Sequence, residues 1–299
     1  MNIMYNCIKN RIFFIFCIFF IQPCSNSTHI IIVQTRNYFN PFHTRARKFF
    51  RLFTTFFPLD KTKRKGYNAF TMKNILTVRP IAHIRSDFKE KFGIPRQSGR
   101  APALESEIIF ETEFRNPDAL RGIEEFSHLW LIFDFSAAHR EEWSATVRPP
   151  RLGGNTRVGV FASRSPFRPN PIGLSCVQLL RVEKRENEGC VLIVSGADLL
   201  DGTPILDIKP YLPFADCQIE ATGGYASAHE KDGVEVLFPE ELLQMIPESK
   251  RKGLLQCLAD DPRPSYQEDE TRVYGMKFAE FDVKFSVQDN KLTVVSVTK

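Results

Sequence analysis

The chain of 299 residues lacks the patterns of several common architectures. It contains no Gly-X-Gly-X-X-Gly motif after a strand-like segment, which argues against a Rossmann dinucleotide or cofactor site. It contains no Cys-X-X-Cys pair and no Cys/His spacing typical of zinc, so we expect no metal. Its longest N-terminal apolar run, Ile12 to Ile21, is too short for a confident membrane span, although it resembles the apolar core of a signal peptide.

Acidic residues are almost absent from residues 1–71, where Asp60 alone stands against 11 Lys and Arg residues. This segment also holds 13 of the 27 phenylalanines. Three interpretations remain open: an over-called upstream start with translation beginning at Met72, an organellar or secretory targeting segment, or a functional arm. The basic stretch 37–65 could contact RNA or could be solvated, disordered chain.

A large positive charge is missing from the rest of the chain. Residues 72–299 carry 29 Lys and Arg against 34 Asp and Glu, a net charge of −5. Bulk charge therefore gives no support for nucleic-acid binding, and any RNA contact must come from a local basic face. The seven cysteines are scattered, which is typical of reduced thiols in a cytosolic protein.

Many short apolar segments follow one another between turns, which indicates a closed or nearly closed β-barrel. Strands are expected at 81–84, 104–111, 127–135, 157–162, 174–182, 191–194 and 203–208. Pro117 is expected to open a helical turn. From residue 220 onward, helical patterns at 239–246 and 248–258 and a strand pair at 278–287 and 291–297 predict a small α+β appendage. We therefore divide the chain into residues 1–71, a barrel at 72–219 and an appendage at 220–299.

The most informative segment is Arg164 to Cys176, RSPFRPNPIGLSC. Three prolines fix φ near −65° and stiffen it, and two arginines lie four residues apart within it. A rigid cationic segment of this kind suggests a bound anion or polar cofactor, and a surface turn with solvated arginines is the plainer alternative.

This segment, with PPRLGGNTRVGVFAS before it and DGTPILDIKPYLPFAD after it, resembles the TrmO family, also called TsaA-like. The resemblance runs from about residue 81 to about residue 297. It implies a non-Rossmann β-barrel, S-adenosylmethionine as cofactor, and tRNA adenine-N6 methylation. It further implies the N6 atom of threonylcarbamoyladenosine at position 37 as acceptor, a homodimer that binds the anticodon loop, and a cytoplasmic location. We expect no membrane association for residues 72–299.

The resemblance also maps cofactor positions onto this sequence. They are Pro95, Arg96, Gln97, Phe135, Ser136, Arg164, Leu174, Asp201, Gly202, Thr203 and Pro204. At Ser136 the family has a histidine, so this chain has no imidazole at that position to act as a base. His139 could substitute for it or could be a solvated loop residue, and His128 is more typical of a structural histidine. The catalytic residues are not assigned.

Further polar residues are candidates for contact with the tRNA. They are Arg168, Asn170, Lys209 and Tyr211 in the barrel motifs, and Arg263, Tyr266, Arg272 and Tyr274 in the appendage. Arginines near aromatic rings suit unpaired bases and phosphates, while packing of the appendage on the barrel explains the second group equally well. Two other functions stay open: a barrel that binds cofactor or RNA without methyl transfer, and a small-molecule methyltransferase.

Overall fold

The computed structural model describes residues 76–149, 152, 156–229, 233–263, 269 and 271–299. The three interpretations of residues 1–71 therefore lie outside the described residues, as does Tyr266. Within the described part, none of the helices is long and apolar enough to cross a membrane.

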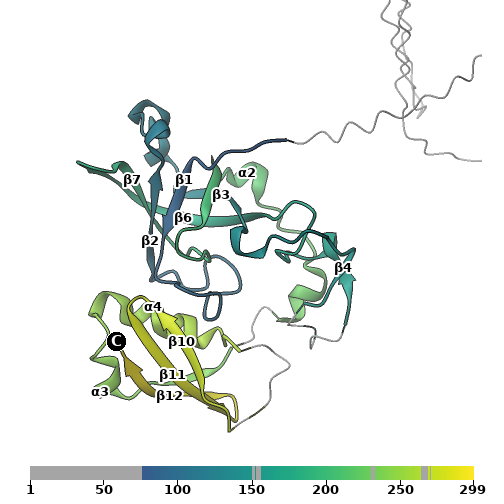
Figure 1. The fold of residues 1–299 in the computed structure, drawn as a ribbon, viewed down its shortest axis with the longest axis vertical. Coiled ribbons are helices and arrows are strands. Elements are labelled where there is room, and N and C mark those ends of the chain that lie inside the picture. The colour runs from purple at the N-terminus through teal and green to yellow at the C-terminus, as the bar shows by residue number, and fades with distance from the viewer. Residues whose placement is uncertain (1–75, 150–151, 153–155, 230–232, 264–268, 270) are drawn as a thin grey trace, which may run out of the picture. The chain divides into compact units, whose positions relative to one another are not determined.

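Six antiparallel strands close into a barrel in the order β1-β2-β7-β6-β3-β8 (Figure 1). They are β1 (Ala82–Arg85), β2 (Glu105–Phe110), β3 (His128–Asp134), β6 (Ile172–Arg185), β7 (Gly189–Ser195) and β8 (Pro204–Pro210). The ring closes where β1 pairs with β8, Ala82 opposite Ile205. The expectation of a mainly β, barrel-based fold is confirmed.

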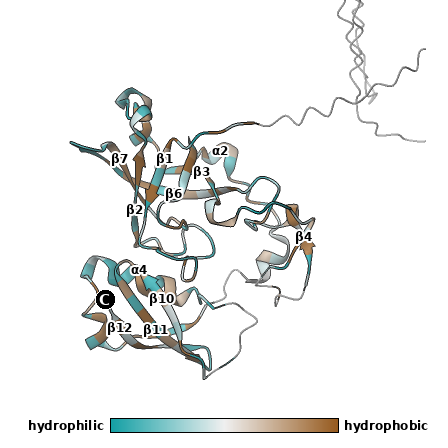
Figure 2. Ribbon diagram, viewed as in Figure 1, coloured by the Kyte–Doolittle hydropathy of each residue, from teal (hydrophilic) through white to brown (hydrophobic). Residues whose placement is uncertain are grey.

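The barrel core follows from strict alternation along the strands. In β3, Leu129, Leu131 and Phe133 are buried, whereas the residues between them are partly exposed. A period of two places every second side chain on one face of a strand, so these three residues fill the interior with Ile84 and Ile205. Figure 2 shows the apolar segments along the barrel strands.

One strand expectation is wrong. Residues 157–162 were expected to form a strand, but β5 contains only Val158–Gly159 and pairs with β4 (Thr146–Val147) outside the barrel. A 3-10 helix, Val160–Ala162, follows it. The hydroxyl of Ser163 donates to the carbonyl of Val160 (2.9 Å) and so closes a turn that competes with a continuing strand.

Several short 3-10 helices connect the barrel strands. Pro117–Leu120 is one of them, and the side chain of Asn116 accepts a hydrogen bond from the N–H of Asp118, so the expected turn after Asn116 is present. The others include Thr112–Phe114, Ile123–Glu125 and Ser136–Ala138. After β8 the chain forms the short helix α2 (Pro213–Asp216) and the 3-10 helix Gly224–His229.

The C-terminal part is a four-stranded sheet with two helices. The elements are β9 (Glu235–Leu237), α3 (Glu240–Leu243), α4 (Glu248–Ala259), β10 (Tyr274–Phe278), β11 (Phe281–Gln288) and β12 (Lys291–Thr298). The sheet order is β10-β11-β12-β9, with β9 parallel to β12.

The expected helices and the turn at Asp289–Asn290 are present, the two turn residues having φ of 48° and 60°. The expected strand 278–287 is instead interrupted at Ala279 (φ 51°), because Phe278 ends β10 and Phe281 begins β11.

A second core is shared between the C-terminal sheet and the segment that follows β1. Phe88 forms an isolated β-bridge with Phe278, and their rings meet edge to face at 6.5 Å. Leu104 packs against α4, where a Cβ on Gly253 would lie 2.2 Å from a Leu104 methyl carbon. The segment 86–104 connects the barrel strands β1 and β2, and its buried side chains belong to the C-terminal core.

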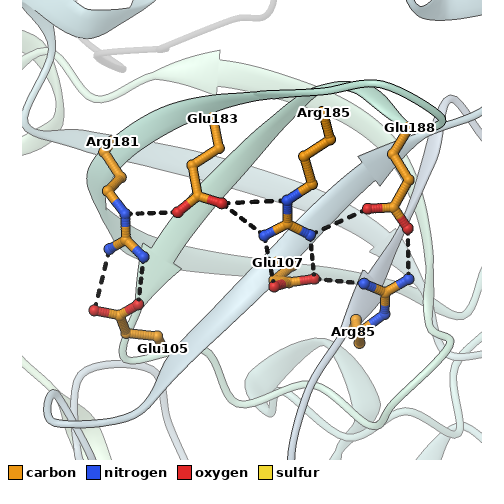
Figure 3. Close-up of polar contacts among 7 residues, drawn as sticks. All are labelled: Arg85, Glu105, Glu107, Arg181, Glu183, Arg185 and Glu188. Atoms are coloured by element: carbon orange, nitrogen blue, oxygen red, sulfur yellow. Dashed lines mark hydrogen bonds and ion pairs between the residues drawn. The ribbon is translucent and has the colours of Figure 1, made fainter.

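A network of charged side chains, here called the ion ladder, covers part of the outer face of the barrel (Figure 3). Its members are Arg85, Glu105, Glu107, Arg181, Glu183, Arg185 and Glu188. Ile109, Val191 and Ile193 lie on the same outward face and are almost completely buried. The arginine stems can cover apolar surface while their guanidinium groups remain paired.

Arg185 is the centre of the ion ladder. It donates to Glu107, Glu183 and Glu188 at 2.7–3.1 Å. Hydrogen bonding from Arg185, together with that from Arg85, holds the pKa of Glu107 below its usual value against the opposing effect of partial burial. Glu107 therefore stays ionised at a lower pH than an unpaired glutamate does.

Candidate functional site

The Arg164 segment has almost no regular structure, yet its own hydrogen bonds hold it. It runs from the 3-10 helix Val160–Ala162 to the start of β6. The Ser163 hydroxyl accepts from the N–H of Ser165 (3.3 Å), and the Arg168 guanidinium donates to the carbonyl of Ser163 (3.0 Å). The prolines restrict the remaining backbone freedom. The segment therefore presents Arg164 from a stiff backbone.

Arg164 contacts the loop that contains Pro95, Arg96 and Gln97, and it lies 67 residues from Gln97 in the sequence. Its Nη1 donates to Oε1 of Gln97 (2.5 Å), and Nε2 of Gln97 donates to the carbonyl of Arg96 (2.6 Å). The fold thus brings together two positions that the motifs alone could only suggest.

Arg96 has partners of another kind. Its guanidinium donates to the carbonyls of Asp261 (2.7 Å) and Arg263 (2.6 Å), and its backbone N–H donates to the buried carboxylate of Asp260 (3.1 Å). Arg100 also pairs with Asp260 (2.9 Å). In this conformation Arg96 anchors the 95–97 loop to the end of α4.

An open cleft of about 1920 Å³ extends in front of these residues. It is lined by parts of 91–100, 138–149, 157–171, 223–227 and 257–263. Nine Lys and Arg side chains of the described residues line it, against only Glu141, Glu142 and Asp260. Since residues 72–299 carry a net charge of −5, the cleft is a local concentration of positive charge, which favours a polyanionic ligand.

Asp198, which the sequence analysis missed, lies close to this arrangement. It accepts a hydrogen bond from the buried hydroxyl of Ser175 (2.5 Å). Burial raises the pKa of its carboxyl group, while the Ser175 hydrogen bond and the charge of Arg164 act in the opposite direction. Its place just before the Asp201 turn was the only sequence signal that pointed to it.

The Asp201 turn lies outside the cleft lining and is tied to the end of β1. Asp201 accepts from the N–H of Ser86 (2.9 Å) and pairs with Lys89 (2.7 Å). Gly202 has φ +77°, which only glycine adopts readily, and Thr203 donates to the carbonyl of Leu200 (2.7 Å). Pro204 then opens β8. The turn therefore has a clear structural role in this conformation.

Phe135, Ser136 and Leu174 are also absent from the cleft lining. Phe135 packs edge-on against Phe133 (5.0 Å), and Ser136 is exposed. Leu174 lies half-exposed on β6, opposite Ile132. His139 does line the cleft, with Nε2 at 2.7 Å from the Asp134 carboxylate.

The candidates for RNA contact fall into separate groups. Arg168 and Arg263 line the cleft, and Arg263 pairs with Asp261 (2.9 Å). Lys209, which pairs with Asp207, and Tyr211, which packs beside Trp130 at 5.7 Å, do not line it. Asn170 is exposed, and the guanidinium of Arg272 lies 5.1 Å from the centre of the Tyr274 ring.

Two family models match the chain. The tRNA-methyltransferase O N-terminal domain matches residues 83–217, and the TrmO C-terminal domain matches residues 232–299. A tRNA (adenine(37)-N6)-methyltransferase of Escherichia coli is 43% identical over 217 residues, covering 70% of this chain and 92% of that protein. A Pseudomonas aeruginosa protein named putative S-adenosylmethionine-dependent methyltransferase RcsF is 44% identical over 215 residues, covering 69% and 90%.

Solved structures agree with these matches. A crystal structure of TrmO from Pseudomonas aeruginosa superposes with a TM-score of 0.60 at 36% identity, covering 75% of this chain and all of that one. Fold and sequence together define a methyltransferase built on a β-barrel. Within that class, the chain belongs to the tRNA-methyltransferase O family, and the resemblance inferred from the motifs is confirmed.

Proposed function

We propose that the protein transfers a methyl group from S-adenosylmethionine to the N6 atom of the adenine at position 37 of a tRNA. The name of the Escherichia coli relative supports the reaction, and that of the Pseudomonas aeruginosa relative supports the cofactor. The observation that carries the proposal for this chain is the contact of Arg164 with Gln97 in a basic cleft.

The residues at this end of the cleft fit S-adenosylmethionine. Arg164 supplies a guanidinium for the carboxylate of the cofactor, and Gln97 fixes the orientation of that guanidinium. Apolar side chains such as Ile94 and Phe167 contribute to the walls. When bound, the cofactor supplies an electrophilic methyl group on a sulfonium, a good leaving group. What the protein must add is mainly the positioning of the two reactants.

We propose the remaining family positions, Pro95, Arg96, Phe135, Ser136, Leu174 and Asp201 to Pro204, as further cofactor contacts. Several of them already have intramolecular partners, so a role in binding requires those contacts to open or to be shared. Asp201, with one oxygen on Ser86 and the other near Lys89, is the clearest example.

The proposed acceptor is threonylcarbamoyladenosine, and the proposed RNA element is the anticodon loop. A carbonyl group next to N6 makes its proton easier to lose, so a strong protein base is not required. The replacement of the family histidine by the exposed Ser136 is consistent with this acceptor. Unpaired loop bases are also the form of RNA that proteins read most readily.

We further propose a homodimer that works in the cytoplasm. Ile172, Leu174 and Leu180 are exposed apolar side chains on one face of β6, which suits burial against a second copy. The cysteines of the described residues are all free thiols, in keeping with a reducing compartment.

The direct test uses threonine tRNA that already carries the threonylcarbamoyl group. The protein, S-adenosylmethionine and this tRNA are incubated, and the nucleosides are measured by mass spectrometry. We expect a gain of one methylene mass on the modified adenosine.

Arg164→Ala should lower kcat/KM about 10- to 150-fold through loss of charge-assisted hydrogen bonds, and Arg164→Lys should recover only part of that loss.

Two results would contradict parts of the proposal. No mass gain with a folded protein that binds the cofactor would reject the methyl transfer to this nucleoside. An equal gain on tRNA lacking the threonylcarbamoyl group would leave adenine methylation intact but reject the proposed acceptor.

A further inference from the structure

Two exposed aromatic rings stand together on the wall of the basic cleft. Trp143 is 55% exposed and Phe161 is 74% exposed, although large apolar side chains are usually covered. Their ring centroids lie 6.4 Å apart with an angle of 30° between the planes. Both line the cleft that Arg164 lines. We call this pair the aromatic platform.

The local fold holds the aromatic platform in place. The strands β4 and β5 form a two-stranded ribbon outside the barrel, with Thr146 opposite Gly159. Trp143 precedes β4 by three residues and Phe161 follows β5 by two, so the ribbon brings both to one end. In the 3-10 helix after β5, Val160 is buried and directs the turn inward, which leaves Phe161 facing solvent.

The surroundings of the platform indicate the kind of ligand. Cations exceed acidic groups nine to three among the described residues of the cleft wall. The guanidinium of Arg140 lies 3.6 Å from the centre of the Phe167 ring. This stacked pair adds a second flat surface, which is cationic, to the same wall of the cleft. Exposed aromatic rings among cations are the arrangement that binds single-stranded nucleic acid, with bases on the rings and phosphates on the cations.

The platform is also connected to the cofactor end of the cleft. Phe161 precedes Arg164 by three residues, and Ser163 ties the intervening backbone to Val160. A base stacked on Phe161 would therefore be held close to Arg164, because both residues belong to one stiff segment. We propose that Trp143 and Phe161 stack an unpaired base of the RNA substrate and so position the RNA for the reaction. This inference rests on the proposed function, because it assigns the platform to the same RNA.

Binding experiments on the full chain test the platform without methyl transfer. The probe is a synthetic anticodon stem-loop of threonine tRNA, and the matched probe has the same backbone with abasic loop positions. Trp143→Ala and Phe161→Ala should each weaken binding of the stem-loop about 5- to 150-fold, the range for loss of one base–aromatic stack. Neither should change binding of the abasic probe, and Trp143→Phe should retain most of the affinity.

Two control variants separate stacking from charge and from general surface effects. Phe214→Ala removes an aromatic ring that is 86% exposed but does not line the cleft, and it should bind both probes as the wild type does. Arg148→Gln removes a charge from the cleft and should reduce the slope of log affinity against log salt, whereas Trp143→Ala should leave that slope unchanged.

Fluorescence gives a second readout, since the sequence holds only two tryptophans. Trp130 donates its Nε1–H to Asp216 and does not line the cleft, so Trp130→Phe leaves Trp143 as the sole reporter. The stem-loop should quench this emission and the abasic probe should not.

Two results would reject the stacking role of the platform and leave the proposed methyl transfer untouched. One is equal affinity of Trp143→Ala and the wild type for the stem-loop, and the other is equal quenching by both probes. Conversely, failure of methylation by a wild type that shows base-dependent quenching would reject the proposed reaction and keep the platform.

Discussion

Gly173 shows how a single residue of the Arg164 motif serves packing as well as the site. The ring of Phe133, on the neighbouring strand β3, covers it so closely that an added Cβ would lie 2.2 Å from the ring. Phe133 is part of the barrel core and packs against Phe135. The glycine that follows the three prolines is therefore required by the core.

We predict that Gly173→Ala destabilises the protein by about 1–3 kcal/mol, because the core must shift to admit the methyl group. Urea unfolding followed by circular dichroism measures the change. Gly173→Ala combined with Phe133→Leu should recover part of the loss, since a smaller side chain then faces the alanine. A double variant no more stable than Gly173→Ala alone would show that the clash with Phe133 is not the cause.

At the scale of single residues, the motifs identified which residues belong to the site, but they did not identify which residues contact one another. Arg164 and Gln97 came from the sequence, and the structure places them in direct contact. Asp198 was missed, because its importance depends on burial and on Ser175, which is 23 residues away and reaches it only through the barrel. The partners of Asp201 and Arg96 were likewise invisible, since each comes from a distant segment.

The ion ladder belongs to the scale of strands, because it joins β1, β2, β6 and the end of the β6–β7 connection. Hydrogen bonds from arginines lower the pKa of Glu107, Glu183 and Glu188. A carboxylate with a pKa lower in the folded than in the unfolded state stabilises the fold above its unfolded pKa, near 4.3 for Glu. That contribution is lost as the pH falls through the folded value.

Replacement of Glu107 by Gln should therefore have a pH-dependent effect. At pH 7 we expect the Tm to fall by about 2–4 °C, equivalent to about 1 kcal/mol in a protein of this size, because Arg85 and Arg185 lose a shared partner. The difference from wild type should shrink below about pH 4 as Glu107 itself becomes neutral. Calorimetric scans from pH 3 to 8 measure it, and a difference that stayed constant across this range would contradict the assignment.

Strand positions in the barrel were predictable because apolar residues alternate along them. At 157–162 the same pattern gave a wrong strand prediction. Alternation cannot reveal that this segment pairs with no barrel strand, nor that Ser163 closes a turn in its backbone. The break at Ala279 was missed for a related reason. Ala-Glu is no turn signal, and the N–H of Ala279 is held by the carbonyl of Asp87 from another part of the chain.

For the whole molecule, we predict that residues 72–299 suffice for folding, dimerisation and methyl transfer. The family models match only within 83–299, and the barrel core and the C-terminal core are built from residues 81–299. Light scattering should give twice the monomer mass, and Leu180→Glu should shift it toward the monomer by placing charge on the exposed β6 face. A monomeric wild type, or a truncated protein without activity while the full chain is active, would contradict this prediction.

By itself, the sequence determined the family, the β-rich fold class and most strand positions, because motifs and alternation are local properties of the chain. Only the tertiary structure decided which charges meet. It gathers positive charge in one cleft of a chain segment whose net charge is negative. It also places Trp143 beside Phe161 and directs Arg96 to backbone carbonyls rather than to open solvent. Such contacts depend on how distant segments close around the barrel, and no local pattern records that closure.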